Sequence, residues 1–130
     1  MEDDKIQVIA HMWLEAYRSD SELLSDKKAI KISNYLNLIF DGPEVDFWTF
    51  FDEIVRGTET EFQVANFGCG PLETYLNTRP VRIDFVAERV ARGGLNVEML
   101  ALVDYEDVRD SALKSLLRSL IGERTRGRDL

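Results

Sequence analysis

The sequence contains one cysteine and one histidine, Cys69 and His11, among its 130 residues. A single cysteine cannot form an internal disulfide, so the composition is typical of a protein of the reducing cytoplasm. A zinc site of histidine and cysteine ligands needs more of these residues than the chain has. No stretch approaches the roughly 18 apolar residues of a membrane span, and the acidic residues 1–4 do not resemble a signal peptide. We therefore expect a cytoplasmic protein with no disulfide, no zinc, no cofactor and no membrane partner.

The charge of the chain is negative and unevenly distributed. The formal net charge is −8, while the hydrophobic content of 45% and the charged content of 31% are those of an ordinary globular protein. Residues 1–73 carry 15 acidic against 6 basic side chains, whereas residues 74–130 carry 9 against 10. A negative field repels nucleic acid and attracts basic proteins. A basic protein is therefore the expected partner, and nucleic acid is not.

Apolar residues recur at helical spacing through most of the chain. Ile6, Ile9, Ala10 and Trp13, for example, follow the i, i+3, i+4, i+7 pattern of one helix face. Together with the turn residues between such segments, this spacing predicts an all-α fold, a single-domain bundle of seven or eight short helices. The domain is expected to span residues 1–122, with Gly122 ending the last helix and residues 123–130 forming a mobile, Arg-rich tail. The expected helices span residues 3–17, 26–40, 43–56, 58–67, 71–77, 79–92, 95–103 and 106–121.

Three local features refine this prediction. The spacing of Thr58 and Glu61 is that of a capping box at the start of a helix. Residues 95–103 could form a short helix or a buried strand, and we favour the helix because no other segment offers a strand partner. Similar dipeptides at Asp46-Phe47 and Asp84-Phe85, about 38 residues apart, point to stacked helical hairpins.

The stretch from Gly68 to Glu73 predicts a sharp turn between two helices. Gly68 suits the left-handed position just past a helix end, and Pro71 suits the first turn of the next helix. Glu73 then falls in that first turn, where its carboxylate can cap the free amides of its own helix. The small residues from Gly68 to Gly70 would let the helices approach closely.

The motif Gly70-Pro71-Leu72-Glu73, preceded by small residues and followed by Tyr75-Leu76, resembles the signature of a small bacterial domain family of unknown function. Members of that family carry an Ala/Gly-rich turn before the motif, and Cys69 stands where they often have alanine or glycine. The resemblance extends more loosely from the Trp13 helix to the last helix. It implies an all-helical fold and no activity.

Few residues have the types and spacing that catalysis requires. Cys69 lies beside a predicted helix start, which lowers the pKa of a thiol, but its possible base His11 is far away in the sequence. Glu73 could be a general acid or base, but capping of its own helix is the interpretation that we favour. The acidic residues near the third helix lack the alternating pattern of a calcium loop and are interpreted as a solvated face. No metal ligands are assigned.

Three functions remain open from the sequence. We favour a non-enzymatic binding protein whose acidic face recognises a basic partner, for example an immunity or antitoxin-type inhibitor of a cationic nuclease. The segment 41–61 motivates this choice, because seven acids and one arginine there accompany an aromatic-rich helix. The alternatives are a structural or self-associating scaffold module and a small enzyme using Glu73, Cys69 or the acidic cluster. The predicted partner-binding residues, with Trp48 as an exposed aromatic anchor, are Asp46, Trp48, Asp52, Glu53, Glu59 and Glu61.

A group of arginines in the second half allows two interpretations. They could bind a phosphorylated or acidic partner, or they could pair with the acidic half of the same molecule, which is the interpretation we favour. The arginines are Arg79, Arg82, Arg89 and Arg92.

Overall fold

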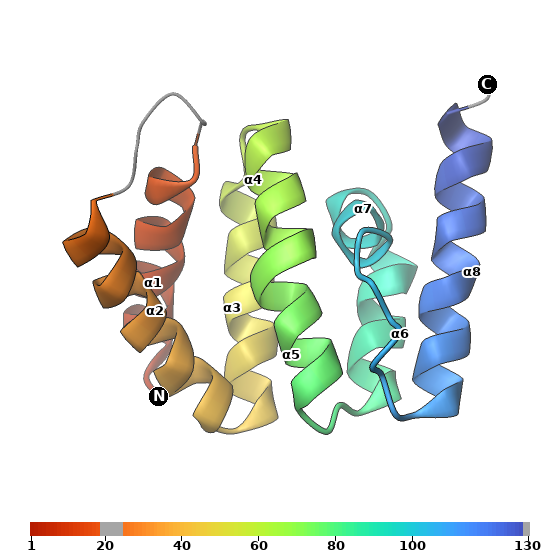
Figure 1. Ribbon diagram of the computed structural model, residues 1–130, viewed down its shortest axis with the longest axis horizontal. Helices are drawn as coiled ribbons and strands as arrows, with labels where there is room; N and C mark the ends of the chain where they lie inside the picture. The colour runs from red at the N-terminus through yellow and green to blue at the C-terminus, as the bar shows by residue number, and fades with distance from the viewer. Residues whose placement is uncertain (19–24, 129–130) are drawn as a thin grey trace. The chain divides into compact units, whose positions relative to one another are not determined.

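A computed structural model describes the backbone of residues 1–18 and 25–128 and the side chains of these residues up to Leu120. All of the regular secondary structure in these residues is helical, which confirms the predicted all-α fold (Figure 1). None of the described helices is both long enough and apolar enough to cross a membrane. The elements in chain order are α1 (Asp3–Ala16), α2 (Asp26–Asp41), α3 (Glu44–Gly57), α4 (Glu61–Phe67), the π-helical turn η1 (Gly68–Leu72), α5 (Glu73–Thr78), α6 (Ile83–Arg92), α7 (Leu95–Leu100) and α8 (Ser111–Arg128).

The chain divides into two compact units, Met1–Gln63 and Val64–Leu130, here called unit 1 and unit 2. In unit 1, α1 packs mainly on α3. In unit 2, α7 packs on η1, α6 and α8. The single domain expected for residues 1–122 stays a prediction.

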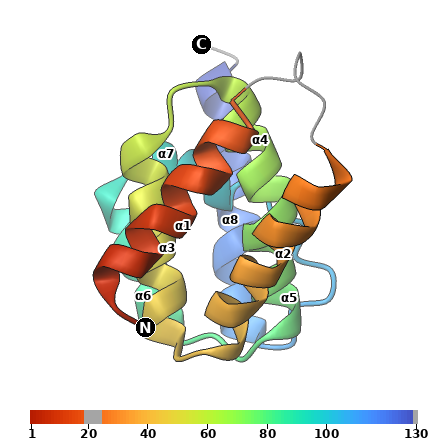
Figure 2. The ribbon, with the colours of Figure 1, turned by 90° about the vertical axis from the view of Figure 1, so that its left-hand side faces the viewer.

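Unit 1 is built on the pair α1 and α3, with α2 against both. The two helices run in the same direction (Figure 2), since the Met1 ammonium lies 3.1 Å from Asp46 at one end, while Gly57 faces Leu14 at the other. The apolar stripes predicted for both helices are confirmed as buried. The Phe47 ring of α3 packs edge-on to Phe40 of α2, with centroids 5.7 Å apart. These aromatic contacts make α3 the centre of unit 1.

The ends of the unit 1 helices show one clear cap and correct one prediction. Ser25 caps α2 by accepting a hydrogen bond from the Lys28 amide at 3.3 Å. The capping box predicted for Thr58 and Glu61 is wrong, because the Thr58 hydroxyl donates back to the Ile54 carbonyl of α3. Instead Thr60 Oγ1 accepts from the Gln63 amide, and Gln63 Oε1 accepts from the Thr60 amide. Glutamine serves as well as glutamate at the last position of such a box. The turn expected at residues 19–21 lies outside the described residues.

Helix α2 buries less than its sequence suggests. Ile32, Ile39 and Phe40 are buried, but Ile30 and Leu38, which are also apolar, are 61% and 51% exposed. A single face of α2 is therefore packed within the described residues.

Unit 2 begins at the predicted turn, whose location is confirmed but whose geometry is different. Gly68 does not adopt a left-handed conformation, and the kink falls at Gly70 (φ −115°, ψ −105°). A side chain at Gly68 would meet the Leu102 side chain and the Met99 carbonyl at 2.9 Å. The close contact is therefore with α7 and the segment after it, not between the two helices that flank the turn as predicted, and it is the reason for glycine at position 68.

The remaining unit 2 predictions are partly confirmed. Residues 95–100 are helical as expected, and Gly93 and Gly94 break the chain with φ of 69° and 59°. Thr78 ends α5, and its hydroxyl donates to the Thr74 carbonyl. The last helix begins at Ser111, five residues later than expected, because Asp110 caps it by accepting from the Leu113 amide. It also continues through Gly122 to Arg128, so the predicted end at Gly122 is wrong.

Candidate functional site

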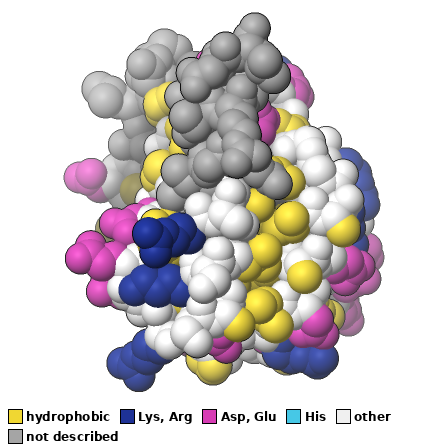
Figure 3. All heavy atoms as spheres, turned by 90° about the vertical axis from the view of Figure 1, so that its right-hand side faces the viewer, with side chains coloured by type: hydrophobic (Ala, Val, Ile, Leu, Met, Phe, Trp, Pro, Cys, Tyr) yellow, Lys and Arg dark blue, Asp and Glu magenta, His cyan; other side chains and the backbone are white. Residues whose placement is uncertain are grey.

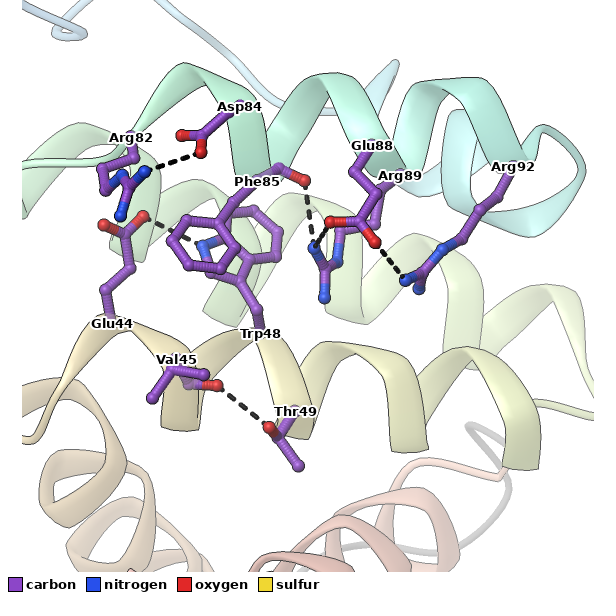
Figure 4. Close-up of polar contacts among 10 residues, drawn as sticks. All are labelled: Glu44, Val45, Trp48, Thr49, Arg82, Asp84, Phe85, Glu88, Arg89 and Arg92. Carbon is purple, nitrogen blue, oxygen red and sulfur yellow. Dashed lines mark hydrogen bonds and ion pairs between the residues drawn. The ribbon is translucent and has the colours of Figure 1, made fainter.

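The predicted partner-binding residues do not form one surface. Trp48 is fully buried, and its Nε1 donates to Glu44 Oε2 at 2.9 Å (Figure 4), so the predicted exposed aromatic anchor is wrong. Asp46 is also buried, beside the Met1 ammonium. The two residues lie near the start of α3, whereas Glu59 and Glu61 follow its end, about 20 Å away for a helix of 14 residues.

Two of the remaining predicted acids form ion pairs within the chain. Glu53 forms an ion pair with Arg56 at 2.7 Å, one turn further along α3. Glu59 forms another with Arg18 at 2.7 Å, and both of those side chains are more than 60% exposed. Asp52 is half-buried, and only Glu61 of this group is both exposed and outside any ion pair within the described residues. Exposed pairs of this kind contribute little to stability, roughly 0–1 kcal/mol each.

A different group of acids is brought together by the tertiary structure. The parallel arrangement of α1 and α3 places the starts of both helices at one end of unit 1, where α2 also ends (Figure 2). The Asp46 carboxylate lies 3.4 Å from the position that a Cβ atom would take at Gly42, just after α2. We call this surface the acidic end; its five accessible acidic residues are Glu2, Asp3, Asp4, Asp41 and Glu44, while Asp46 lies buried behind them. The basic groups close to it are the Met1 ammonium and Lys5.

Apolar side chains are exposed beside these acids. Met1 is 40% exposed, Val45 between two acids of α3 is 54% exposed, and Leu38 in the last turn of α2 is 51% exposed. Exposed large hydrophobic residues surrounded by charged ones are the usual composition of a protein-binding patch, with an apolar centre and a polar rim. Sequence reasoning missed this site because the acids of α1 and α3 are some 40 residues apart and become neighbours only through helix packing.

The arginines of α6 lie in contacts within their own helix. Arg82 pairs with Asp84 at 2.8 Å and Arg92 with Glu88 at 3.0 Å (Figure 4). Arg89 is 5% exposed and donates to the Phe85 carbonyl at 3.1 Å. Both acidic partners, Asp84 and Glu88, belong to the second half of the chain, so these contacts do not confirm the expected pairing with the acidic half. Figure 3 shows basic and acidic side chains on either side of exposed hydrophobic ones on the face near α8.

The residues considered for catalysis lie in structural contacts. Glu73 accepts a hydrogen bond from the Asp104 amide at 2.6 Å, so it holds the segment after α7 rather than capping its own helix as predicted. The exposed Cys69 thiol lies 3.8 Å from the Leu102 carbonyl. His11 is exposed on α1 of unit 1. No group of three or more metal-ligating side chains occurs among the described residues.

Asn77 completes the attachment of the segment after α7 to α5. Its side-chain nitrogen donates to the Asp104 carbonyl at 2.8 Å and to the Glu73 carbonyl at 2.8 Å. Its oxygen accepts from the Asp107 amide at 3.1 Å. One amide side chain thus pairs with three backbone groups, which only asparagine or glutamine can do.

We expect Asn77→Ala to lower the free energy of unfolding by about 2 kcal/mol, because backbone groups of Asp104 and Asp107 lose their partner. Amide hydrogen exchange should accelerate between residues 101 and 110. The control is Thr74→Ala, an exposed position on the same helix. Equal stabilities for the two variants would show that Asn77 does not hold this segment.

Comparison of the chain with protein-family models, curated proteins and solved structures gives no match. The resemblance carried by Gly70-Pro71-Leu72-Glu73 therefore stays a prediction.

Proposed function

We propose that this protein is a non-enzymatic binding protein whose acidic end recognises a basic protein partner. The observation that carries the proposal is the gathering of five accessible acidic residues, at the start of α1, the end of α2 and the start of α3, beside exposed apolar side chains of the same elements. The apolar centre would supply contact area, and the carboxylates around it would select a basic partner.

The distribution of charge between the units supports this assignment. Unit 1 contains 14 acidic and 6 basic side chains, a net charge of −8, whereas unit 2 contains 10 of each. The negative electrostatic field of unit 1 accelerates association with a basic protein and disfavours the binding of acidic ones. One concrete form of this function is an immunity or antitoxin-type inhibitor that covers the basic surface of a nuclease.

The test begins with capture of partners from native lysate and continues with the dissociation constant of the captured basic protein. We expect the triple variant Asp3→Asn, Asp4→Asn, Asp41→Asn to weaken this affinity about tenfold, which corresponds to roughly 1.4 kcal/mol, and to slow association. The affinity of the unmodified chain should fall as salt is raised, because salt screens exposed charges.

The matched control is the triple variant Glu15→Gln, Asp26→Asn, Glu61→Gln. It changes the net charge of unit 1 by the same amount at exposed positions away from the acidic end. Equal weakening by the two triple variants would show a diffuse effect of net charge and would overturn the assignment to the acidic end. Sedimentation of the chain alone separates partner binding from the self-association of a scaffold module.

A further inference from the structure

Unit 2 contains a cleft of about 700 Å³, which lies outside the acidic end. It lies between the end of α5, the connection to α6 and the start of α8. Leu76, Val81, Val108 and Leu113 contribute apolar lining, and three of these four side chains are at most 6% exposed. This volume is within the usual range for sites that bind small organic ligands.

The walls of this cleft are held by internal hydrogen bonds. Asn77 and Thr78 line it, yet the Asn77 amide is paired with three backbone groups and the Thr78 hydroxyl donates to the Thr74 carbonyl at 2.6 Å. Asp110 also lines it, and its carboxylate accepts from the Leu113 amide at 3.0 Å as the cap of α8. A cleft with fixed walls binds a ligand at a lower entropic cost than one that must form on binding.

Three charged side chains line the cleft, and one of them, Arg109, is placed to bind a ligand. Arg79 donates to the Thr78 hydroxyl at 3.1 Å. Arg109 is exposed and has no hydrogen bond or ion pair with another residue in the described part of the chain. With Asp110, the charged lining sums to +1, which matches a monoanion better than a doubly charged phosphate.

We propose that this cleft binds a monocarboxylate with an apolar body, with the carboxylate on Arg109 and the body against Leu76, Val108 and Leu113. A guanidinium can donate two parallel hydrogen bonds to one carboxylate, which suits arginine to this role. The carboxylate is that of a small organic acid or of a peptide end with an apolar last residue. The site lies wholly in unit 2 and is independent of the acidic end.

The experiment is a titration of the full chain, labelled with ¹⁵N, with 4-phenylbutyrate and with the uncharged 4-phenylbutanol. We expect 4-phenylbutyrate to shift the amide signals of Asn77, Val81 and Leu113 with a dissociation constant near or below about 1 mM, and the alcohol to bind about tenfold more weakly. A short peptide ending in leucine with a free carboxylate is titrated in the same way. Whichever of 4-phenylbutyrate and the peptide has the lower dissociation constant then identifies the source of the carboxylate.

The variant that tests the role of the cation is Arg109→Met, which keeps an unbranched apolar chain at an exposed position. Its control is Arg118→Met, an exposed arginine on α8 that does not line the cleft. We expect a loss of affinity of about tenfold in the first variant and none in the second. No shift of the cleft amides by either acid at about 10 mM, or equal binding of acid and alcohol, would overturn the proposal.

Discussion

Replacement of Phe47 by alanine should lower the free energy of unfolding by about 4 kcal/mol, the largest effect that we expect in this protein. Phe47 is fully buried, with its ring 5.7 Å from that of Phe40 and 5.1 Å from that of Trp48. The alanine variant loses the hydrophobic contribution of the ring and leaves a cavity that its aromatic neighbours cannot fill without leaving their own positions. Chemical denaturation monitored by circular dichroism measures the loss.

The matched control for Phe47 is Val45→Ala, two residues earlier in the same helix and 54% exposed. The backbone change is comparable, since both variants place alanine in the first turn of α3, but little buried surface is lost in the control. We expect a change within about 0.5 kcal/mol there. Similar losses in the two variants would mean that α3 does not provide the centre of the unit 1 core.

Gly68→Val should lower the free energy of unfolding by about 3 kcal/mol and the melting temperature by roughly 10 °C. The added Cβ would lie 2.9 Å from both the Leu102 Cβ and the Met99 carbonyl oxygen. Neither contact involves the far end of a flexible side chain, so η1 and the end of α7 must move apart. Thermal unfolding followed by circular dichroism measures this shift.

Cys69→Val provides the comparison for Gly68. It places the same β-branched side chain at the next residue of the same turn, where the native side chain is exposed. We expect a change in melting temperature of only about 2 °C, because no buried group has to move. If Gly68→Val and Cys69→Val had the same melting temperature, close packing between η1 and α7 would not explain why position 68 is glycine.

The helices themselves were predictable because their signals are local. Repeats of apolar residues at i, i+3 and i+4 located the buried stripes of α1 and α3, and Gly93 and Gly94 marked a break that the backbone confirms with positive φ at both. Errors of a few residues arose where two caps competed. Thr60 with Gln63 begins α4 in place of Thr58 with Glu61, and Asp110 begins α8 later than expected.

The candidate site was less predictable than the helices. Segment 41–61 was correctly recognised as acidic, yet periodicity could not show that Trp48 turns inward to Glu44 or that Asp46 is covered by the start of α1. The acids that do lie together come from helices distant in the sequence. Arg109 had no local signal at all, because its role depends on the cleft that α5 and α8 form.

The sequence by itself determined the class of fold, the approximate position of each helix and the concentration of negative charge in the first half. These properties follow from residue spacing and composition, which act over one or two helical turns or over the whole chain. The tertiary structure alone decided which acids share the acidic end, why position 68 is glycine and where unit 2 has a cleft. Each of these depends on contacts between residues some 30 or more positions apart, which a local pattern does not encode.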